Sequence, residues 1–152
     1  MRLSFACLLL AAGAAPPALG QDGAQLYAQH CVACHQPNGA GAPGLAPPLA
    51  GALRGFAGTQ TGRRYLAQVL VSGLSGRVEY HGPPYFGNMP GFKHLKDEEL
   101  AQVASYVLSE LNRDTLPPGT GLMRTEEFAE ARAHALNARD IKQLRLTALD
   151  RR

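Results

Sequence analysis

The chain has 152 residues, among them 17 glycines, 11 prolines and no tryptophan, and only 7% of its residues are aromatic. That length provides one domain with its own core and a short extension. The formal charge of +3 is too small to imply binding to nucleic acid or to a membrane surface. With so few aromatic side chains, the core must contain mainly aliphatic residues unless something else large and apolar fills it.

Residues 1–20 have the features of a signal peptide. Arg2 gives a positively charged start, and the apolar run at 5–12 is too short to span a bilayer. Small residues occupy the positions that a signal peptidase reads before Gln21. Cleavage there removes Cys7 and leaves two cysteines. We therefore predict an exported, periplasmic protein with no membrane span of its own.

The two remaining cysteines stand in the sequence Cys31-Val32-Ala33-Cys34-His35, at the end of a predicted helix over residues 22–33. C-x-x-C-H is the attachment signature of haem c. Two thiols at this spacing reach the two vinyl groups on one edge of the porphyrin, and the following imidazole points at the iron. We predict one covalent haem c, bound through Cys31 and Cys34, with His35 as an iron ligand.

A zinc site, a redox-active dithiol and a structural disulfide are alternative interpretations of the cysteine pair. A structural zinc ion takes four ligands, and the sequence has no second cysteine pair. A thioredoxin-like dithiol belongs in a βαβ pattern, which the hydrophobic periodicity does not indicate. A disulfide across two residues is usually strained. The haem is therefore the favoured interpretation.

After the motif, the sequence predicts two further helices separated by loops. Residues 36–61 form a loop rich in Gly, Pro and Ala, and a helix from Arg63 to Ser72 stops at Gly73. Residues 74–94 form a second loop. The clearest helix runs from Asp97 to about Asn112, where apolar residues recur at i, i+3 and i+4. Because no segment has a convincing strand pattern, we predict an all-α protein with long loops.

A second iron ligand is predicted in the second loop. Met89 is followed by Pro90, which fixes the local backbone and cannot continue a helix. Gly87 and Gly91 flank this pair and allow the loop to approach a flat ring closely. A thioether opposite an imidazole raises the reduction potential of haem iron and closes it to small ligands. Met89 therefore suits a haem that transfers electrons.

Three other side chains are alternatives to Met89. His81 and His94 lie in the same loop, and His81 is expected to be solvated unless it contacts a haem propionate or ligates the iron in a minor state. Met123 follows a Gly-Thr-Gly sequence and lacks the turn setting of Met89.

Residues 114–152 follow the predicted haem domain, residues 21–113, and form a C-terminal extension. A break rich in Pro and Gly at 117–121 precedes apolar residues at helical spacing, and basic residues are frequent near the end. We predict one or two amphipathic helices. They pack on the haem domain, stay partly ordered or dock on a partner subunit, and these alternatives remain open.

From residue 22 to about 113 the chain resembles the class I mono-haem c-type cytochromes. The resemblance rests on the haem motif, on the methionine loop and on two helix pairs. Gly23 and Tyr27 match the small and aromatic residues of the first helix where it crosses the last helix, and Val103 and Tyr106 match their counterparts. The resemblance implies the class I cytochrome c fold, with three to five helices and long loops wrapped around one haem.

The resemblance also implies roles for Pro47 and Leu49. In this family the carbonyl of a proline at this distance from the motif accepts a hydrogen bond from the ligand histidine, and by position that proline is Pro47. Such a bond fixes the ring of His35 and adjusts its basicity. Leu49 is expected to pack against the haem face.

Residues 76–90 resemble a subgroup that includes cytochrome subunits or domains of periplasmic dehydrogenases, reductases and oxidases. The implied function is single-electron transfer in the periplasm with His35 and Met89 as axial ligands, as a carrier or as the cytochrome subunit of a respiratory redox complex. Such a protein is not itself an enzyme. Its expected partners are redox proteins (a dehydrogenase, a reductase or a terminal oxidase), with no nucleic acid, no small-molecule substrate and the membrane reached only through a partner. The alternatives are a gas or redox sensor and a small haem enzyme with a displaceable distal ligand.

Overall fold

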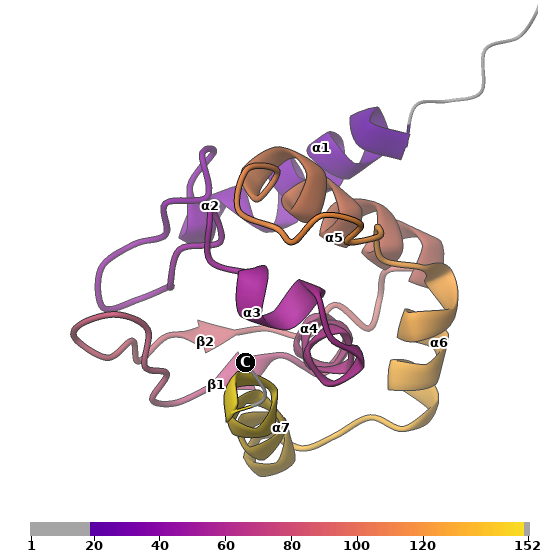
Figure 1. Cartoon of the computed structure of the whole chain (residues 1–152). Helices are drawn as coiled ribbons and strands as arrows, with labels where there is room; N and C mark the ends of the chain where they lie inside the picture. Colours follow the sequence, from indigo (N-terminus) through magenta and orange to yellow (C-terminus); the bar gives the residue numbers. More distant parts are fainter. Residues whose placement is uncertain (1–18, 151–152) are drawn as a thin grey trace, which may run out of the picture.

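The computed structural model describes residues 19–150, so most of the predicted signal peptide lies outside the described residues. The all-α class is confirmed, because helices make up most of the described chain (Figure 1). In chain order the elements are α1 (Leu19–His30), α2 (Val32–His35), α3 (Arg54–Ala57), α4 (Gln60–Ser72), β1 (Leu74–Ser75), β2 (Asn88–Met89), α5 (Asp97–Leu111), α6 (Thr125–Ala133) and α7 (Ala138–Asp150).

The first helix crosses α5 at close range, as the resemblance implied. A Cβ atom added to Gly23 would lie 2.5 Å from the carbonyl oxygen of Gln102 and 2.9 Å from Cβ of Tyr106. One turn further, the rings of Tyr27 and Tyr106 lie 5.4 Å apart between centroids. Tyr27 is fully buried with Val103 in one apolar cluster. This crossing holds the helix that leads into the haem motif against the last helix of the predicted haem domain.

The central helix α4 begins earlier than predicted. Thr59 Oγ1 accepts a hydrogen bond from the Gly62 N–H at 3.0 Å, which caps the helix and starts it at Gln60. The helix ends at Ser72, and Gly73 follows with a φ of 82°, the left-handed conformation that favours a glycine stop. The short α3 was not predicted, because four residues carry too little periodicity to be recognised.

A small strand pair follows α4 and was also not predicted. Leu74 pairs with Met89, and Ser75 pairs with Asn88, in antiparallel register. Each strand has only two residues, too few to produce an alternating pattern in the sequence. The pair fixes the backbone of Met89 beside the end of α4.

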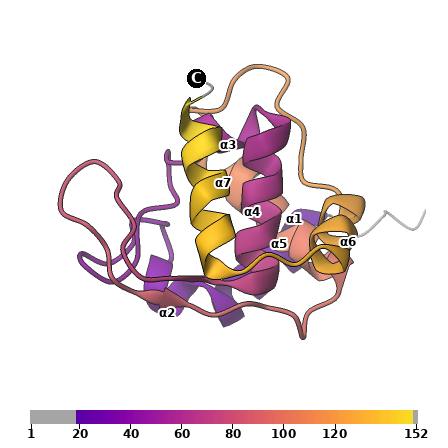
Figure 2. The ribbon, with the colours of Figure 1, turned by 90° about the horizontal axis from the view of Figure 1, so that it is seen from below.

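The C-terminal segment packs back on α4, which lies between α6 and α7 (Figure 2). Gln68 on α4 is buried, and its amide holds the turn between the two C-terminal helices. The amide nitrogen donates to the carbonyl oxygens of Ala131 at 3.2 Å and His134 at 2.9 Å. The amide oxygen accepts from the Leu136 N–H at 3.0 Å. The extension is therefore joined to the rest of the molecule by specific polar contacts as well as by packing.

The C-terminal helices also contribute fully buried apolar side chains to the core. Phe128 of α6 belongs to the main cluster around α4 and α5. Ile141 and Ala148 of α7 pack with Phe56 and Tyr65 in a second cluster. Within residues 19–150, no helix combines the length and apolarity that crossing a bilayer requires.

Candidate functional site

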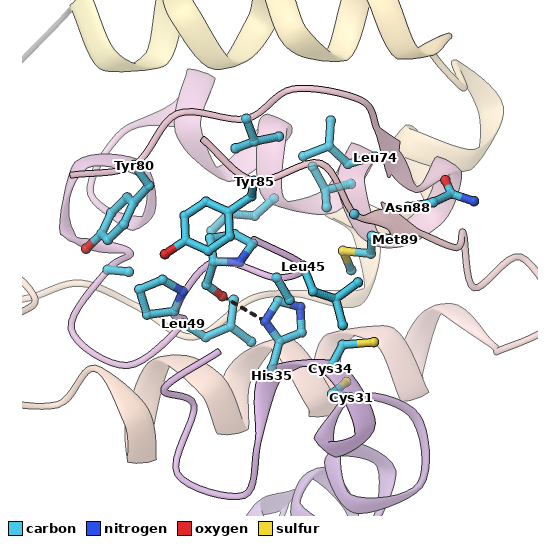
Figure 3. A pocket seen from close by; sticks show the side chains of 18 of the residues that line it. Cys31, Cys34, His35, Leu45, Leu49, Leu74, Tyr80, Tyr85, Asn88 and Met89 are labelled. Atoms are coloured by element: carbon cyan, nitrogen blue, oxygen red, sulfur yellow. Dashed lines mark hydrogen bonds between the residues drawn. The ribbon is translucent and has the colours of Figure 1, made fainter. Parts of the chain in front are cut away.

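Two adjoining cavities lie between the haem motif, α4 and the strand pair. Their empty volumes are about 1060 Å³ and 590 Å³, with the open mouth included. Cys31, His35 and Met89 line both, so the cavities are the larger and the smaller lobe of one site (Figure 3). The other residues that line both lobes are apolar: Leu49, Leu53, Leu66 and Val69. This lining suits a large, mostly apolar ligand.

The haem motif lies at the break between α1 and α2. The His35 N–H donates to the Cys31 carbonyl oxygen at 2.9 Å, which closes one helical turn over the motif. Both thiols are free; Cys31 is partly buried and Cys34 is exposed. Figure 3 shows both side chains beside the His35 ring, at one edge of the site. The turn therefore presents two sulfur atoms and one imidazole together.

The environment of these cysteines disfavours the redox-dithiol and zinc interpretations. Burial, with a smaller contribution from Cys34, raises the pKa of the Cys31 thiol to about 11. Thiolates, not thiols, take part in disulfide exchange, so this group is a poor redox centre. The described residues also contain no cluster of three or more His, Cys, Asp or Glu side chains of the kind a zinc ion needs.

His35 is buried and oriented by a single hydrogen bond. Its Nδ1 lies 3.0 Å from the carbonyl oxygen of Pro47, and because a carbonyl only accepts, Nδ1 carries the proton. The lone pair of Nε2 is then available to a metal. Burial lowers the pKa of His35, and the hydrogen bond to Pro47 opposes this effect only in part. The ring is therefore a neutral imidazole at neutral pH, the form that ligates iron.

Met89 reaches the same site from the strand pair. It is partly buried against the main core cluster and lines both lobes. Figure 3 shows its side chain and that of His35 directed into one cavity from separate elements. At the neighbouring Gly91 an added Cβ would lie 2.6 Å from the carbonyl oxygen of Val71, while Pro90 and Phe92 on either side line the larger lobe. This glycine allows the loop to pass the end of α4.

The other candidate ligands lie in different places. His81 and His94 are exposed, and neither lines a lobe of the site. The ring of His94 lies 5.7 Å from that of His30, and the ring of His81 lies 4.6 Å from that of Tyr80. Met123 is buried and lines the smaller lobe, although nothing around it in the sequence indicated this.

The groups present fit a covalently attached porphyrin. The site has two thiols at one edge, a neutral imidazole beside them, a thioether from another element and a mostly apolar lining (Figure 3). In addition, the sequence profile of the family described as Cytochrome c matches residues 20–110. The chain belongs to the cytochrome c family. Membership means that the cofactor is haem c, attached through the CxxCH cysteines Cys31 and Cys34.

Two relatives of this cytochrome illustrate the range of the family. Cytochrome c-552 of Thermus thermophilus is 40% identical over 120 residues, which cover 79% of this chain and 91% of the relative. The cytochrome c subunit of alcohol dehydrogenase (quinone) from Gluconobacter oxydans is 31% identical over 129 residues, which cover 84% of this chain and 23% of that subunit. The resemblance to class I mono-haem cytochromes is thus confirmed, and the family acts in electron transport.

Several residues of the haem site could not be found from the sequence. Phe56 and Tyr65 line the larger lobe from α3 and α4, and Arg145 reaches it from α7. Met123 reaches the smaller lobe from the segment before α6. None of the four lies near the haem motif in the sequence. Only the packing of the C-terminal segment on α4 brings Met123 and Arg145 to the cavity.

Proposed function

We propose that this cytochrome transfers single electrons in the periplasm, with His35 and Met89 as the axial ligands of its haem iron. The observation that carries the proposal is the position of these two side chains, which enter one apolar cavity from different elements. The haem supplies the one-electron redox chemistry when it is bound. The chain attaches and orients it, and turns over no substrate of its own.

The proton on Nδ1 of His35 supports its role as the proximal ligand. The Pro47 carbonyl fixes the ring and leaves Nε2 without a proton. Leu49 lines both lobes beside this ring and is placed to pack against the haem (Figure 3). On the other side, the pairing of Met89 with Leu74 holds the thioether on a defined backbone and not on a free loop. Two strong ligands in a mostly apolar cavity would leave the iron closed to small ligands.

Export to the periplasm is supported by the charge and apolar run of residues 1–20. The expected mature chain begins at Gln21, which mass spectrometry of the purified protein tests directly. A protein recovered from the cytoplasm with Met1 intact would contradict this part of the proposal.

The partners that we propose are redox proteins: a dehydrogenase, a reductase or a terminal oxidase. The relative from Gluconobacter, a dehydrogenase subunit by name, supports the subunit role. Cytochrome c-552, which aligns over nearly its whole length, supports the carrier role. Purification of the full chain under mild conditions separates the two roles. A subunit is expected to copurify with a redox enzyme in fixed ratio, whereas a carrier is expected to elute alone and to exchange electrons with a partner only transiently.

Spectroscopy of the purified holoprotein tests the ligand assignment. The ferric protein is expected to show the weak near-infrared band of a methionine–iron bond, and the ferrous protein is expected to refuse carbon monoxide. Ready binding of carbon monoxide by the native protein would overturn closed His/Met ligation. It would favour the sensor or small haem enzyme.

A further inference from the structure

Arg145 of α7 brings a positive charge to an otherwise apolar cavity. It lines the larger lobe together with residues of the haem motif, α4 and the methionine loop. Within the described part of the chain, no other Lys or Arg and no Asp or Glu lines that lobe. A partly buried cation at the wall of a cavity of this size is placed to pair with an anion that the cavity takes up.

The position of Arg145 is fixed, yet its charge has no partner in residues 19–150. Nη2 donates to the backbone carbonyl of Glu79 at 2.8 Å. The guanidinium carbon lies 5.6 Å from the centroid of the Phe56 ring, within the range of a cation–π contact. The carboxylate of Glu79 pairs instead with Arg77 at 2.8 Å. Arginine has five N–H donors in a planar fork, and within the described chain the Glu79 carbonyl and the Tyr65 hydroxyl are its hydrogen-bond partners, which leaves further donors for an anion.

Three tyrosines line the same lobe as Arg145: Tyr65, Tyr80 and Tyr85. Tyr65 is buried with Phe56, and the centroids of the two rings lie 4.9 Å apart. Burial raises the pKa of the Tyr65 hydroxyl, and the charge of Arg145, together with a hydrogen bond from that side chain, offsets part of the rise. Figure 3 shows Tyr80 and Tyr85 on the side of the cavity away from Cys31 and Cys34. Tyr80 and Tyr85 therefore lie opposite the thioether edge, whereas His30 and Asn88 line other parts of the lobe (Figure 3).

The arrangement matches the chemistry of the porphyrin itself. Its two vinyl groups lie on one edge and its two propionates on the opposite edge. With Cys31 and Cys34 holding the vinyl edge, the carboxylates would lie on the side of Tyr80 and Tyr85 (Figure 3), and Arg145 adjoins Tyr80 through its bond to the Glu79 carbonyl. A carboxylate in an apolar site is stable only with a charge-assisted hydrogen bond, and arginine provides the strongest such donor.

We propose that Arg145 binds a propionate carboxylate of the haem, so that α7 completes the haem site from the C-terminal segment. Phe56 and the Glu79 carbonyl orient the guanidinium, and hydroxyls of the tyrosines provide further donors. This assigns the propionate contact to Arg145 and not to His81, which lies outside both lobes. The proposal rests on haem attachment through Cys31 and Cys34, which family membership establishes, and not on ligation by Met89.

The charge of Arg145 has a direct redox consequence. Ferric haem carries one more positive charge than ferrous haem, so a fixed cation nearby favours the ferrous form and raises the reduction potential. Removing it is expected to shift the one-electron equilibrium toward the ferric form by about threefold to tenfold, where tenfold corresponds to about 59 mV. Arg145→Lys keeps the charge and is expected to retain most of the wild-type potential.

The test compares holoprotein carrying Arg145→Gln, Arg145→Lys and Arg139→Gln. Arg139 lies on the same helix but is exposed and lines neither lobe. Arg139→Gln is therefore the control: it changes the net charge of the protein by the same amount as Arg145→Gln but leaves the cavity unchanged. We expect a lower potential for Arg145→Gln alone, with a change in the propionate bending modes in the resonance Raman spectrum of both Arg145 variants. Equal potentials and unchanged propionate modes in all three proteins would overturn the proposal.

Two further measurements keep the test decisive. If Arg145→Gln does not accumulate as holoprotein, the propionate modes of Arg145→Lys alone decide the result, since a purely structural role in α7 does not change them. The near-infrared methionine band is expected to persist in every variant, because Arg145 does not contact Met89. If the wild-type protein does not show that band, the proposed ligation by Met89 is contradicted, but the proposed contact between Arg145 and a propionate is not.

Discussion

Arg63 on α4 and Glu127 on α6 form a bidentate ion pair, with Nε–Oε1 and Nη2–Oε2 distances of 2.7 and 2.6 Å. The same guanidinium donates to the carbonyl oxygens of Gly121 at 2.8 Å and Leu122 at 2.7 Å. Both charged side chains are mostly buried, with 17% and 15% of their surface exposed. One arginine therefore fastens the segment containing Met123, and with it the inner wall of the smaller lobe.

Arg63→Ala is expected to lower the free energy of unfolding of the holoprotein by about 2–4 kcal/mol, since it removes the ion pair from a largely buried carboxylate, which keeps only the Arg124 N–H, and leaves two carbonyls without this donor. Denaturant titration followed by circular dichroism measures the loss. Arg113→Ala is the matched control, because Arg113 pairs with Glu110 at the surface, where 69% and 45% of the side chains are exposed. That variant is expected to change stability by less than about 0.5 kcal/mol. Equal losses in the two variants would contradict the role of the buried pair.

The carboxylate of the same pair predicts a pH dependence. Burial raises the pKa of Glu127, but hydrogen bonds from Arg63 and Arg124 and their charges outweigh it, so the pKa lies below its ordinary value in the folded protein. As the pH falls, the unfolded chain therefore takes up this proton first. The stabilisation that ionised Glu127 contributes is complete when the pH is above the ordinary pKa of a glutamate. It is lost as the pH falls toward the lower pKa of Glu127 in the folded protein.

Glu127→Gln is accordingly expected to destabilise the protein at neutral pH and to flatten the fall in stability on acidification. Urea midpoints at a series of pH values from neutral to acidic measure both effects. Parallel curves for the variant and the wild type through the acidic range would show that Glu127 does not contribute to this dependence.

Met89→Ala is expected to open the haem iron. The ferrous variant is expected to bind carbon monoxide and the ferric variant to lose the near-infrared methionine band. The reduction potential is expected to fall markedly, since axial ligands set haem potentials over a range of about 0.8 V. Met123→Leu is the control, because Met123 lines the smaller lobe as part of the core. A closed iron in Met89→Ala together with an open iron in Met123→Leu would reverse the assignment.

The parts of the molecule that were predicted from the sequence depend on residues close together in the chain. The CxxCH motif needs five consecutive residues, Cys31 to His35, whose chemistry is specific to one cofactor. The helix from Asp97 to Leu111 is long enough for its apolar stripe to be recognised, and its predicted bounds agree with the structure to within a residue. At its start, the Glu99 side chain accepts a hydrogen bond from the N–H of Lys96, the residue before the helix, at 2.7 Å.

The features that were missed depend on contacts between distant segments. Arg145 reaches the haem cavity only because Ile141 and Ala148, on the same helix, pack against Phe56 and Tyr65. Helical periodicity predicts an apolar face for this helix but not the surface that the face covers. The strand pair is missed for a related reason: its two strands are joined through a long loop and have too few residues to show alternation.

The close crossing of α1 and α5 predicts that even a methyl side chain at position 23 lowers the stability of the protein. Alanine is the better helix former by about 1 kcal/mol, but its Cβ at position 23 would meet the Gln102 carbonyl oxygen at 2.5 Å. That oxygen belongs to the backbone of α5 and moves only if the whole helix moves. Gly23→Ala is therefore expected to lower the free energy of unfolding by about 1–3 kcal/mol despite the gain in helix propensity.

Gly121→Ala provides the matched control, because no atom lies within 4 Å of a Cβ added there. Thermal unfolding of the two holoproteins compares them, with little change expected at Gly121. A more stable Gly23→Ala protein would show that the helices separate without cost. Because Val103 and Val107 of α5 line the smaller lobe, a shift of this helix is also expected to alter the haem absorption spectrum of Gly23→Ala alone. If Gly23→Ala changes both the haem absorption spectrum and the free energy of unfolding, the position of α5 at this crossing also determines the shape of the cofactor site.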